Sequence, residues 1–63
     1  MKRSEFIKYL NENDCRLYRE GSKHSVFINN STNKRVTLPR HNELHNNFCK
    51  DICKQLEIPI IRK

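Results

Sequence analysis

Three short segments with the pattern of β-strands lie close together in the middle of this chain. Residues 15–20 alternate in polarity, residues 24–29 are rich in β-branched and aromatic side chains, and a third run spans about residues 34–38. The connections are short and polar: residues 21–23 around the only glycine, and the Asn-Asn-Ser-Thr-Asn run of residues 29–33. Parallel strands need a crossover of a dozen or more residues. These connections therefore predict an antiparallel sheet.

A segment with helical periodicity stands on each side of the strands. Ser4 is placed to cap a helix over residues 5–11, and Asn47 is placed to cap a helix over residues 48–56, although a start at Glu43 is also compatible with the pattern. The order α-β-β-β-α predicts an α+β fold with both helices on one face of a three-stranded antiparallel sheet, the layout of a double-stranded-RNA-binding-like domain. The helical side chains expected in the core are Phe6, Leu10, Phe48, Ile52 and Leu56.

The middle strand leaves the choice of face open. His24, Val26 and Ile28 share one side of an extended strand, and Phe27 lies on the other. Both sides carry apolar groups, so the pattern alone does not say which side meets the helices. An apolar outer side would indicate a partner that covers it.

Size and charge limit the classes of function. Sixty-three residues form one small domain, residues 1–63, too short for a nucleotide-binding α/β sheet or a barrel. Thirteen Lys and Arg against seven Asp and Glu give a formal net charge of +6, which favours an anionic partner, above all nucleic acid. Charge alone does not separate binding a nucleic acid from cutting it.

Export, membrane insertion and a disulfide framework are not expected. No apolar run approaches the roughly 20 residues that cross a bilayer, and residues 1–10 lack the apolar region of a signal peptide. The three cysteines, Cys15, Cys49 and Cys53, are an odd number, with two of them only four residues apart. We expect a cytoplasmic protein with reduced thiols.

The strongest candidate for chemistry is His24, which follows the glycine turn at the start of a strand. An imidazole, with an unperturbed pKa of about 6.5, can act as a general acid or base on RNA without a metal. It can take the proton of a 2′-hydroxyl or protonate the leaving 5′-oxygen. Lys23, Arg19 and Arg40 are candidates for holding the phosphate. The alternative is a surface histidine that merely ends a turn.

Pro39, Arg40 and His41 form a second candidate, because the proline constrains the corner from which the two basic side chains project. This corner lies either beside residues 21–24 or at the other end of the sheet, and the spacing does not decide between the two. The alternative is a solvated basic loop.

A metal site is not favoured. His45, Cys49 and Cys53 repeat every four residues, but a fourth ligand and a zinc-knuckle spacing are not seen. The two cysteines fit better as small core residues.

Aromatic and terminal residues leave further alternatives open. Tyr9, Tyr18 and Phe27 either stack on bases or are partly buried in the core, and burial is the simpler expectation. The apolar tail, residues 58–63, either covers the core or packs on a partner.

Taken in order, three stretches resemble the HicA toxins of bacterial and archaeal toxin–antitoxin pairs, also described as YcfA-like small proteins. Residues 1–10 (MKRSEFIKYL) are similar to the first helix of the family, and residues 21–27 (GSKHSVF) to its Gly-Ser-x-His turn and strand. Residues 36–41 (VTLPRH) and the helix that ends in residues 54–56 (KQL) are similar to its final part. Each piece alone is weak, but the combination covers nearly the whole chain.

The resemblance implies a double-stranded-RNA-binding-like fold and a translation-independent mRNA endoribonuclease that needs no metal or other cofactor. The catalytic histidine of the family falls on His24, and we expect Gly21, Ser22, Lys23 and Arg40 to contact RNA around it. The resemblance also implies a HicB-type antitoxin that binds the toxin and shields the active site.

Two competing functions remain open on the sequence. A non-catalytic RNA-binding module needs the basic surface but no particular histidine. A protein-interaction module would use the charge for an acidic partner. The chain also departs from the family where many members have glycine before and after the last helix, because Asn46 and Glu57 occupy those places.

Overall fold

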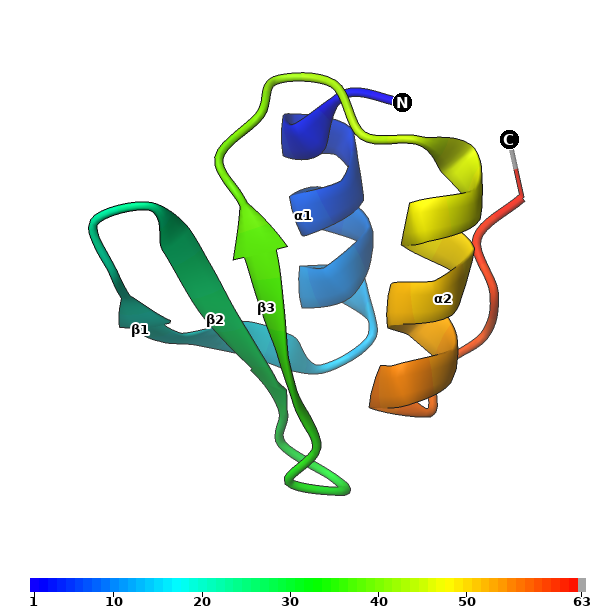
Figure 1. The fold of residues 1–63 in the computed structure, drawn as a ribbon. Coiled ribbons are helices and arrows are strands. Elements are labelled where there is room, and N and C mark those ends of the chain that lie inside the picture. Colours follow the sequence, from blue (N-terminus) through cyan, green and yellow to red (C-terminus); the bar gives the residue numbers. More distant parts are fainter. Residues whose placement is uncertain (63) are drawn as a thin grey trace.

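The structure is a computed structural model that describes residues 1–62. Its elements follow in the order α1 (Arg3–Glu12), β1 (Cys15–Glu20), β2 (His24–Asn29), β3 (Arg35–Pro39) and α2 (Asn46–Leu56) (Figure 1). The strands form one antiparallel sheet with the order β1-β2-β3. The predicted α+β fold and element order are confirmed.

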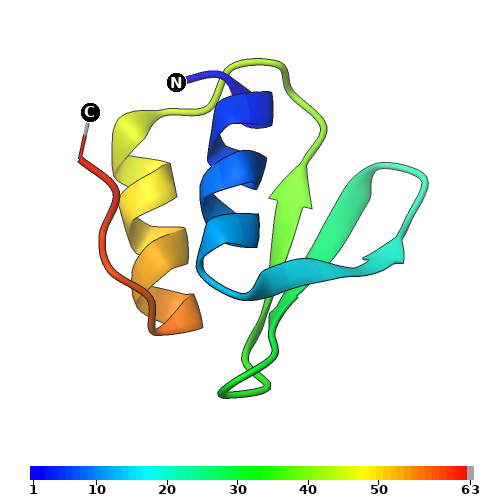
Figure 2. The ribbon, with the colours of Figure 1, turned by 180° about the vertical axis from the view of Figure 1, so that it is seen from behind.

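Both helices lie on the same face of the sheet. Figures 1 and 2 show α1 and α2 side by side and running in the same direction, with the sheet on one side of the pair. The β1–β2 hairpin extends beyond the helices, so its turn stands clear of them (Figure 1). One face of the sheet is therefore covered, and the other is open.

The register shows which side of β2 faces the helices. Ser25, Phe27 and Asn29 are buried in alternation along β2, whereas His24 is exposed and Val26 is only half-buried. The side of β2 that carries His24 is thus the open one, because successive side chains point to opposite faces. This resolves the question that the sequence pattern left open.

The predicted helix starts are wrong by two residues. α1 begins at Arg3 after Lys2, and α2 begins at Asn46 after His45, and neither N-cap makes a side-chain cap hydrogen bond. The reason is that the chain start pairs with the segment before α2: Leu44 N donates to Met1 O at 2.8 Å, and Arg3 N donates to Asn42 O at 2.9 Å. At the start of α1, a backbone oxygen from another part of the chain, Asn42 O, takes the place of the side-chain cap predicted at Ser4. β3 is also shifted by one residue from the predicted range.

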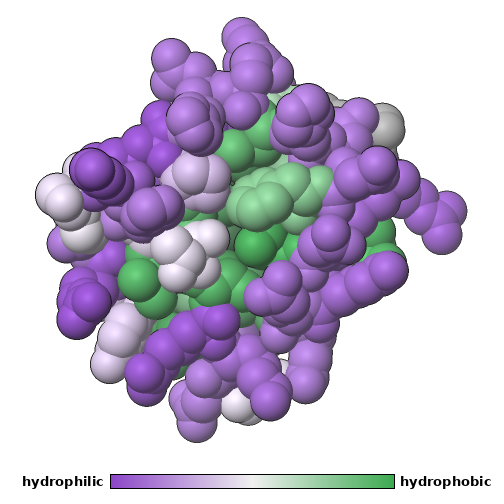
Figure 3. Space-filling view, in the orientation of Figure 1, coloured by the Kyte–Doolittle hydropathy of each residue, from purple (hydrophilic) through white to green (hydrophobic). Residues whose placement is uncertain are grey.

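The core lies between the helices and the covered face of the sheet. The predicted Phe6, Leu10, Ile52 and Leu56 are all buried, and Phe48 is half-buried against them. The space-filling view of Figure 3 shows a mostly hydrophilic surface, with apolar side chains visible in the middle of the view.

The tail covers one side of the core. Ile58 and Ile61 are buried, and the Tyr9 hydroxyl donates to Pro59 O at 2.5 Å, which ties the tail to α1. Residue 63 lies outside the described residues. Glu57, the C-cap of α2, has left-handed backbone angles (φ 59°, ψ 42°), a conformation that favours glycine. Along residues 1–62, neither helix has the length and apolar character to span a membrane.

Candidate active site

His24 is the first residue of β2 and emerges directly from the β1–β2 turn. Gly21 N donates to His24 O at 2.8 Å and closes this turn. The side chain of His24 is exposed and lies on the open face of the sheet. The turn therefore presents the imidazole at the rim of the sheet, where a large polyanion has access to it.

The space in this turn favours glycine at residue 21. A Cβ atom built on Gly21 would lie 3.0 Å from the His24 carbonyl oxygen, closer than nearly all real contacts of that kind. Its backbone does not have a positive φ, so the constraint is steric. Any larger residue would push against the backbone of the residue that carries the imidazole.

The corner after β3 lies beside His24. The register places His24 opposite Pro39, so Arg40 and His41 leave β3 next to the turn. One depression is lined by His24, Pro39, Arg40 and His41 together with Ser22 and Lys23. The spacing left this position undecided, and the β2–β3 register decides it.

A second depression adjoins the first on the open face. It shares Ser22, Lys23 and His24 with its neighbour and is also lined by Gly21 and Arg19 from the hairpin. All the residues singled out in the sequence around His24 thus line one or both depressions. Their positive charges suit a phosphate.

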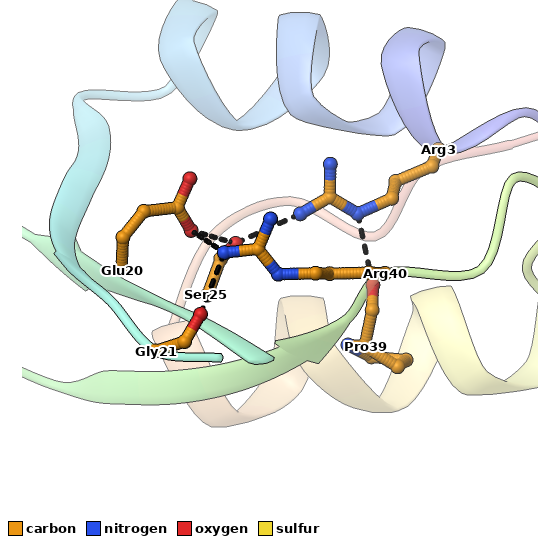
Figure 4. Close-up of polar contacts among 6 residues, drawn as sticks. All are labelled: Arg3, Glu20, Gly21, Ser25, Pro39 and Arg40. Atoms are coloured by element: carbon orange, nitrogen blue, oxygen red, sulfur yellow. Dashed lines mark hydrogen bonds and ion pairs between the residues drawn. The ribbon is translucent and has the colours of Figure 1, made fainter. Parts of the chain in front are cut away.

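The Arg40 side chain contacts the β1–β2 turn. Its Nη2 atom donates to Gly21 O at 2.6 Å and lies 3.0 Å from Glu20 Oε1 (Figure 4). The same nitrogen thus contacts both the backbone and the side chain of the β1 end. Arg40 holds the turn against the β3 corner, a positioning role that the sequence did not indicate.

A polar network supports β2 from the helix side. Arg3 Nη2 donates to Ser25 Oγ at 2.9 Å, its Nε donates to Pro39 O at 2.8 Å, and the Ser25 hydroxyl donates to Glu20 (Figure 4). Ser25 is 1 % exposed. Sequence reasoning missed Arg3, Glu20 and Ser25 as supporting residues. The available signal was that Ser25 shares the strand parity of the apolar Phe27, because a polar group in a core-facing position needs a partner.

The thiols lie in the core, and His45 does not join them. Cys15, Cys49 and Cys53 are free and buried, and His45 is exposed at the N-cap of α2. Burial raises the pKa of all three thiols, which keeps them protonated near neutral pH and makes them poor nucleophiles and ligands. Over residues 1–62, no group of three His, Cys, Asp or Glu side chains is arranged to hold a metal ion.

The three aromatic candidates for base stacking differ in how exposed their side chains are. Phe27 is 3 % exposed in the core, and Tyr9 is half-buried against the tail, so burial is the correct interpretation for these two. Tyr18 is 51 % exposed, and the guanidinium carbon of Arg35 lies 4.4 Å from the centre of its ring. The simpler expectation, burial, is wrong for Tyr18.

Comparison of the sequence with known protein families identifies the family to which the chain belongs. The model of the HicA toxin of bacterial toxin–antitoxin systems matches residues 3–58, which include every helix and strand described above. No curated protein and no solved structure gave a significant match. The chain belongs to the HicA toxin family, whose members are the toxins of toxin–antitoxin systems.

Proposed function

We propose that this toxin is an endoribonuclease that cleaves mRNA and that His24 is its catalytic residue. The observation that carries the proposal is the position of His24: exposed on the open face and shared by two adjoining depressions lined with basic side chains. RNA contains both the nucleophile and the leaving group of the reaction. The protein has to supply only proton transfer and charge stabilisation.

The chemistry follows from one proton transfer to the imidazole. A neutral His24 accepts the proton of a ribose 2′-hydroxyl while that oxygen attacks the adjacent phosphorus. The bond from phosphorus to the 5′-oxygen breaks, and the 5′-oxygen takes up a proton as it leaves. The products are a 2′,3′-cyclic phosphate and a 5′-hydroxyl. The step consumes no metal or other cofactor.

His41 is the candidate for the second proton transfer. It lines the same depression as His24 and comes from the corner after β3 rather than from the hairpin. Two imidazoles on opposite sides of a phosphate can act as base and acid in one turnover. Lys23 and Arg19, also at the depressions, would hold the phosphate, whereas Arg40 is partly used by its contacts with the turn.

The antitoxin partner follows from the family, and its docking site is part of the proposal. We expect a HicB-type antitoxin to cover the open face around His24 and thereby to block access of RNA. Charge favours an antitoxin that presents acidic side chains to Arg19 and Lys23. Co-expression with the antitoxin should relieve the growth arrest that the toxin causes.

The decisive experiment compares wild-type protein with His24→Ala on a labelled RNA, with EDTA present throughout. We expect the wild-type protein to cut the RNA and leave 2′,3′-cyclic phosphate ends, and the variant to lose at least about a hundredfold in rate. His45→Ala is the matched control, because His45 is also exposed but lies at the N-cap of α2. Equal cleavage by wild type and His24→Ala would refute the role of His24. Salt-dependent binding without any product would indicate the non-catalytic RNA-binding module instead.

A further inference from the structure

The open face of the sheet continues well beyond the two depressions at His24. Arg19 pairs with Val26, and Arg35 pairs with Ile28, so these side chains stand on the same face as His24. Tyr18 joins them, because its ring contacts the Arg35 guanidinium. A continuous surface thus runs from the hairpin turn toward the middle of β1 and the start of β3.

The charged side chains that the strands place on this open face are all basic. Within residues 1–62, the acidic side chains lie on the helices and loops, except Glu20, which is on the covered side and paired with Arg40. The open face carries Arg19 and Arg35 without a neighbouring carboxylate from the sheet. A polyanion therefore meets only positive or neutral groups along this surface.

An irregularity in β1 places the aromatic ring. The pairing of β1 with β2 shifts between Leu17 and Arg19, so that Tyr18 is the extra residue on the bulged strand. A bulge redirects a side chain relative to regular alternation. Leu17, which pairs with Phe27, lies on the helix side of the sheet, whereas Tyr18 lies on the open side.

Arg35 and Tyr18 form a stacked pair on the open face, which we call the Tyr18–Arg35 platform. The guanidinium lies over the ring at 4.4 Å from its centre, and half of the tyrosine remains exposed. Planar aromatic and guanidinium groups are the surfaces on which unpaired bases stack. A base inside a duplex has its faces covered by its neighbours, so the platform suits a single strand and not a double helix.

We infer that single-stranded RNA crosses the open face and stacks one base on the Tyr18–Arg35 platform while a phosphate lies at His24. The inference rests on the proposed function, because it extends the substrate-binding surface of that same site. Ile28, beside the platform, lies four residue steps along β2 from His24, a distance of about 13 Å. A few nucleotides bridge that distance, so the stacked base lies outside the scissile step and contributes mainly to binding.

The test measures binding apart from cleavage. A short fluorescent single-stranded oligonucleotide with 2′-O-methyl groups cannot be cut by 2′-hydroxyl attack, and its anisotropy reports the dissociation constant. Tyr18→Ala should weaken binding about tenfold or more, and Tyr18→Phe should retain wild-type affinity. Leu17→Ala is the matched control. Leu17 is the adjacent residue and is equally exposed, at 50 %, but lies on the other face.

The outcomes separate this inference from the proposed function. Unchanged binding by Tyr18→Ala would overturn the inference even if His24→Ala still abolishes cleavage. Equal weakening by Leu17→Ala, or a duplex RNA that binds as tightly as the single strand, would also overturn it. Loss of antitoxin binding with unchanged RNA binding would assign the platform to the protein partner instead.

Discussion

Arg3, at the start of α1, donates a hydrogen bond of 2.9 Å to the hydroxyl of Ser25, the residue that follows His24 in β2. The bond reaches β2 from the helix side, whereas the imidazole points to the open side. The first turn of the helix thus holds the strand directly behind the proposed catalytic residue. The position of His24 and the stability of the fold therefore depend on the same hydrogen bond.

Removing the Ser25 hydroxyl should destabilise the protein. In Ser25→Ala, the Arg3 Nη2 atom loses its acceptor and Glu20 loses a donor, at a position where Ser25 itself is buried. We expect the free energy of unfolding in urea to fall by about 1–2 kcal/mol. Ser22→Ala in the exposed turn should change it by less than about 0.5 kcal/mol. Equal unfolding midpoints for the two variants would show that the network contributes nothing.

Gly21→Ala should impair cleavage more than stability. The added Cβ would lie 3.0 Å from the His24 carbonyl oxygen, and relief of this contact moves the backbone that carries the imidazole. We expect RNA cleavage to slow on the order of tenfold, with a loss of less than about 1 kcal/mol in unfolding free energy. Rates from single-turnover cleavage and midpoints from urea unfolding give the two quantities. A wild-type rate in this variant would show that the turn tolerates the methyl group without displacing His24.

Glu57→Gly should stabilise the protein. Glu57 has a left-handed backbone at the end of α2, a conformation that costs a residue with a Cβ roughly 1 kcal/mol and that glycine adopts freely. We expect a gain of about 0.5–1 kcal/mol, measured as a higher melting temperature. Glu57→Ala keeps the Cβ and should bring no comparable gain. A fall in the melting temperature of Glu57→Gly would contradict this account of the helix end.

Alkaline pH should weaken the fold through the buried thiols. Burial is the main cause that raises the pKa of Cys49 and Cys53, so the folded state holds these protons more tightly than the unfolded chain does. This contribution to stability is complete below the unfolded thiol pKa of roughly 8.5 and is lost as the pH rises above it. The free energy of unfolding should therefore decline above about pH 8.5. The burial of Tyr9, which also raises its pKa, extends the decline to higher pH.

Substitution of one cysteine can separate the contribution of the thiols to the alkaline loss of stability from that of Tyr9. In Cys53→Ala, the free energy of unfolding should fall less steeply than in wild type between about pH 8.5 and 10, because one buried thiol that loses its proton on unfolding has been removed. Native protein at neutral pH should also react slowly with a thiol reagent, since all three sulfur atoms are buried and protonated. Identical alkaline slopes for wild type and Cys53→Ala would refute the assignment to this thiol.

Much of the fold could be predicted because its signals are local. The strands at residues 15–20 and 24–29 were predicted with their observed bounds, since alternation and a glycine turn are properties of neighbouring residues. The start of α1 was not, because its first backbone N–H, that of Arg3, donates to Asn42 O, far away in the sequence. The same applies to Arg3, whose partners Ser25 and Pro39 lie 22 and 36 residues away.

The sequence by itself determined the order of elements, the antiparallel pairing and the turn that carries His24, because short connections leave the chain few ways to pair. Only the tertiary structure decided which face of β2 the helices cover, since both faces carry apolar side chains and the packing of α1 and α2 selects one. It also decided that Pro39 lies opposite His24. That relation depends on the register across the β2–β3 loop, and register is set by which side chains the core accepts.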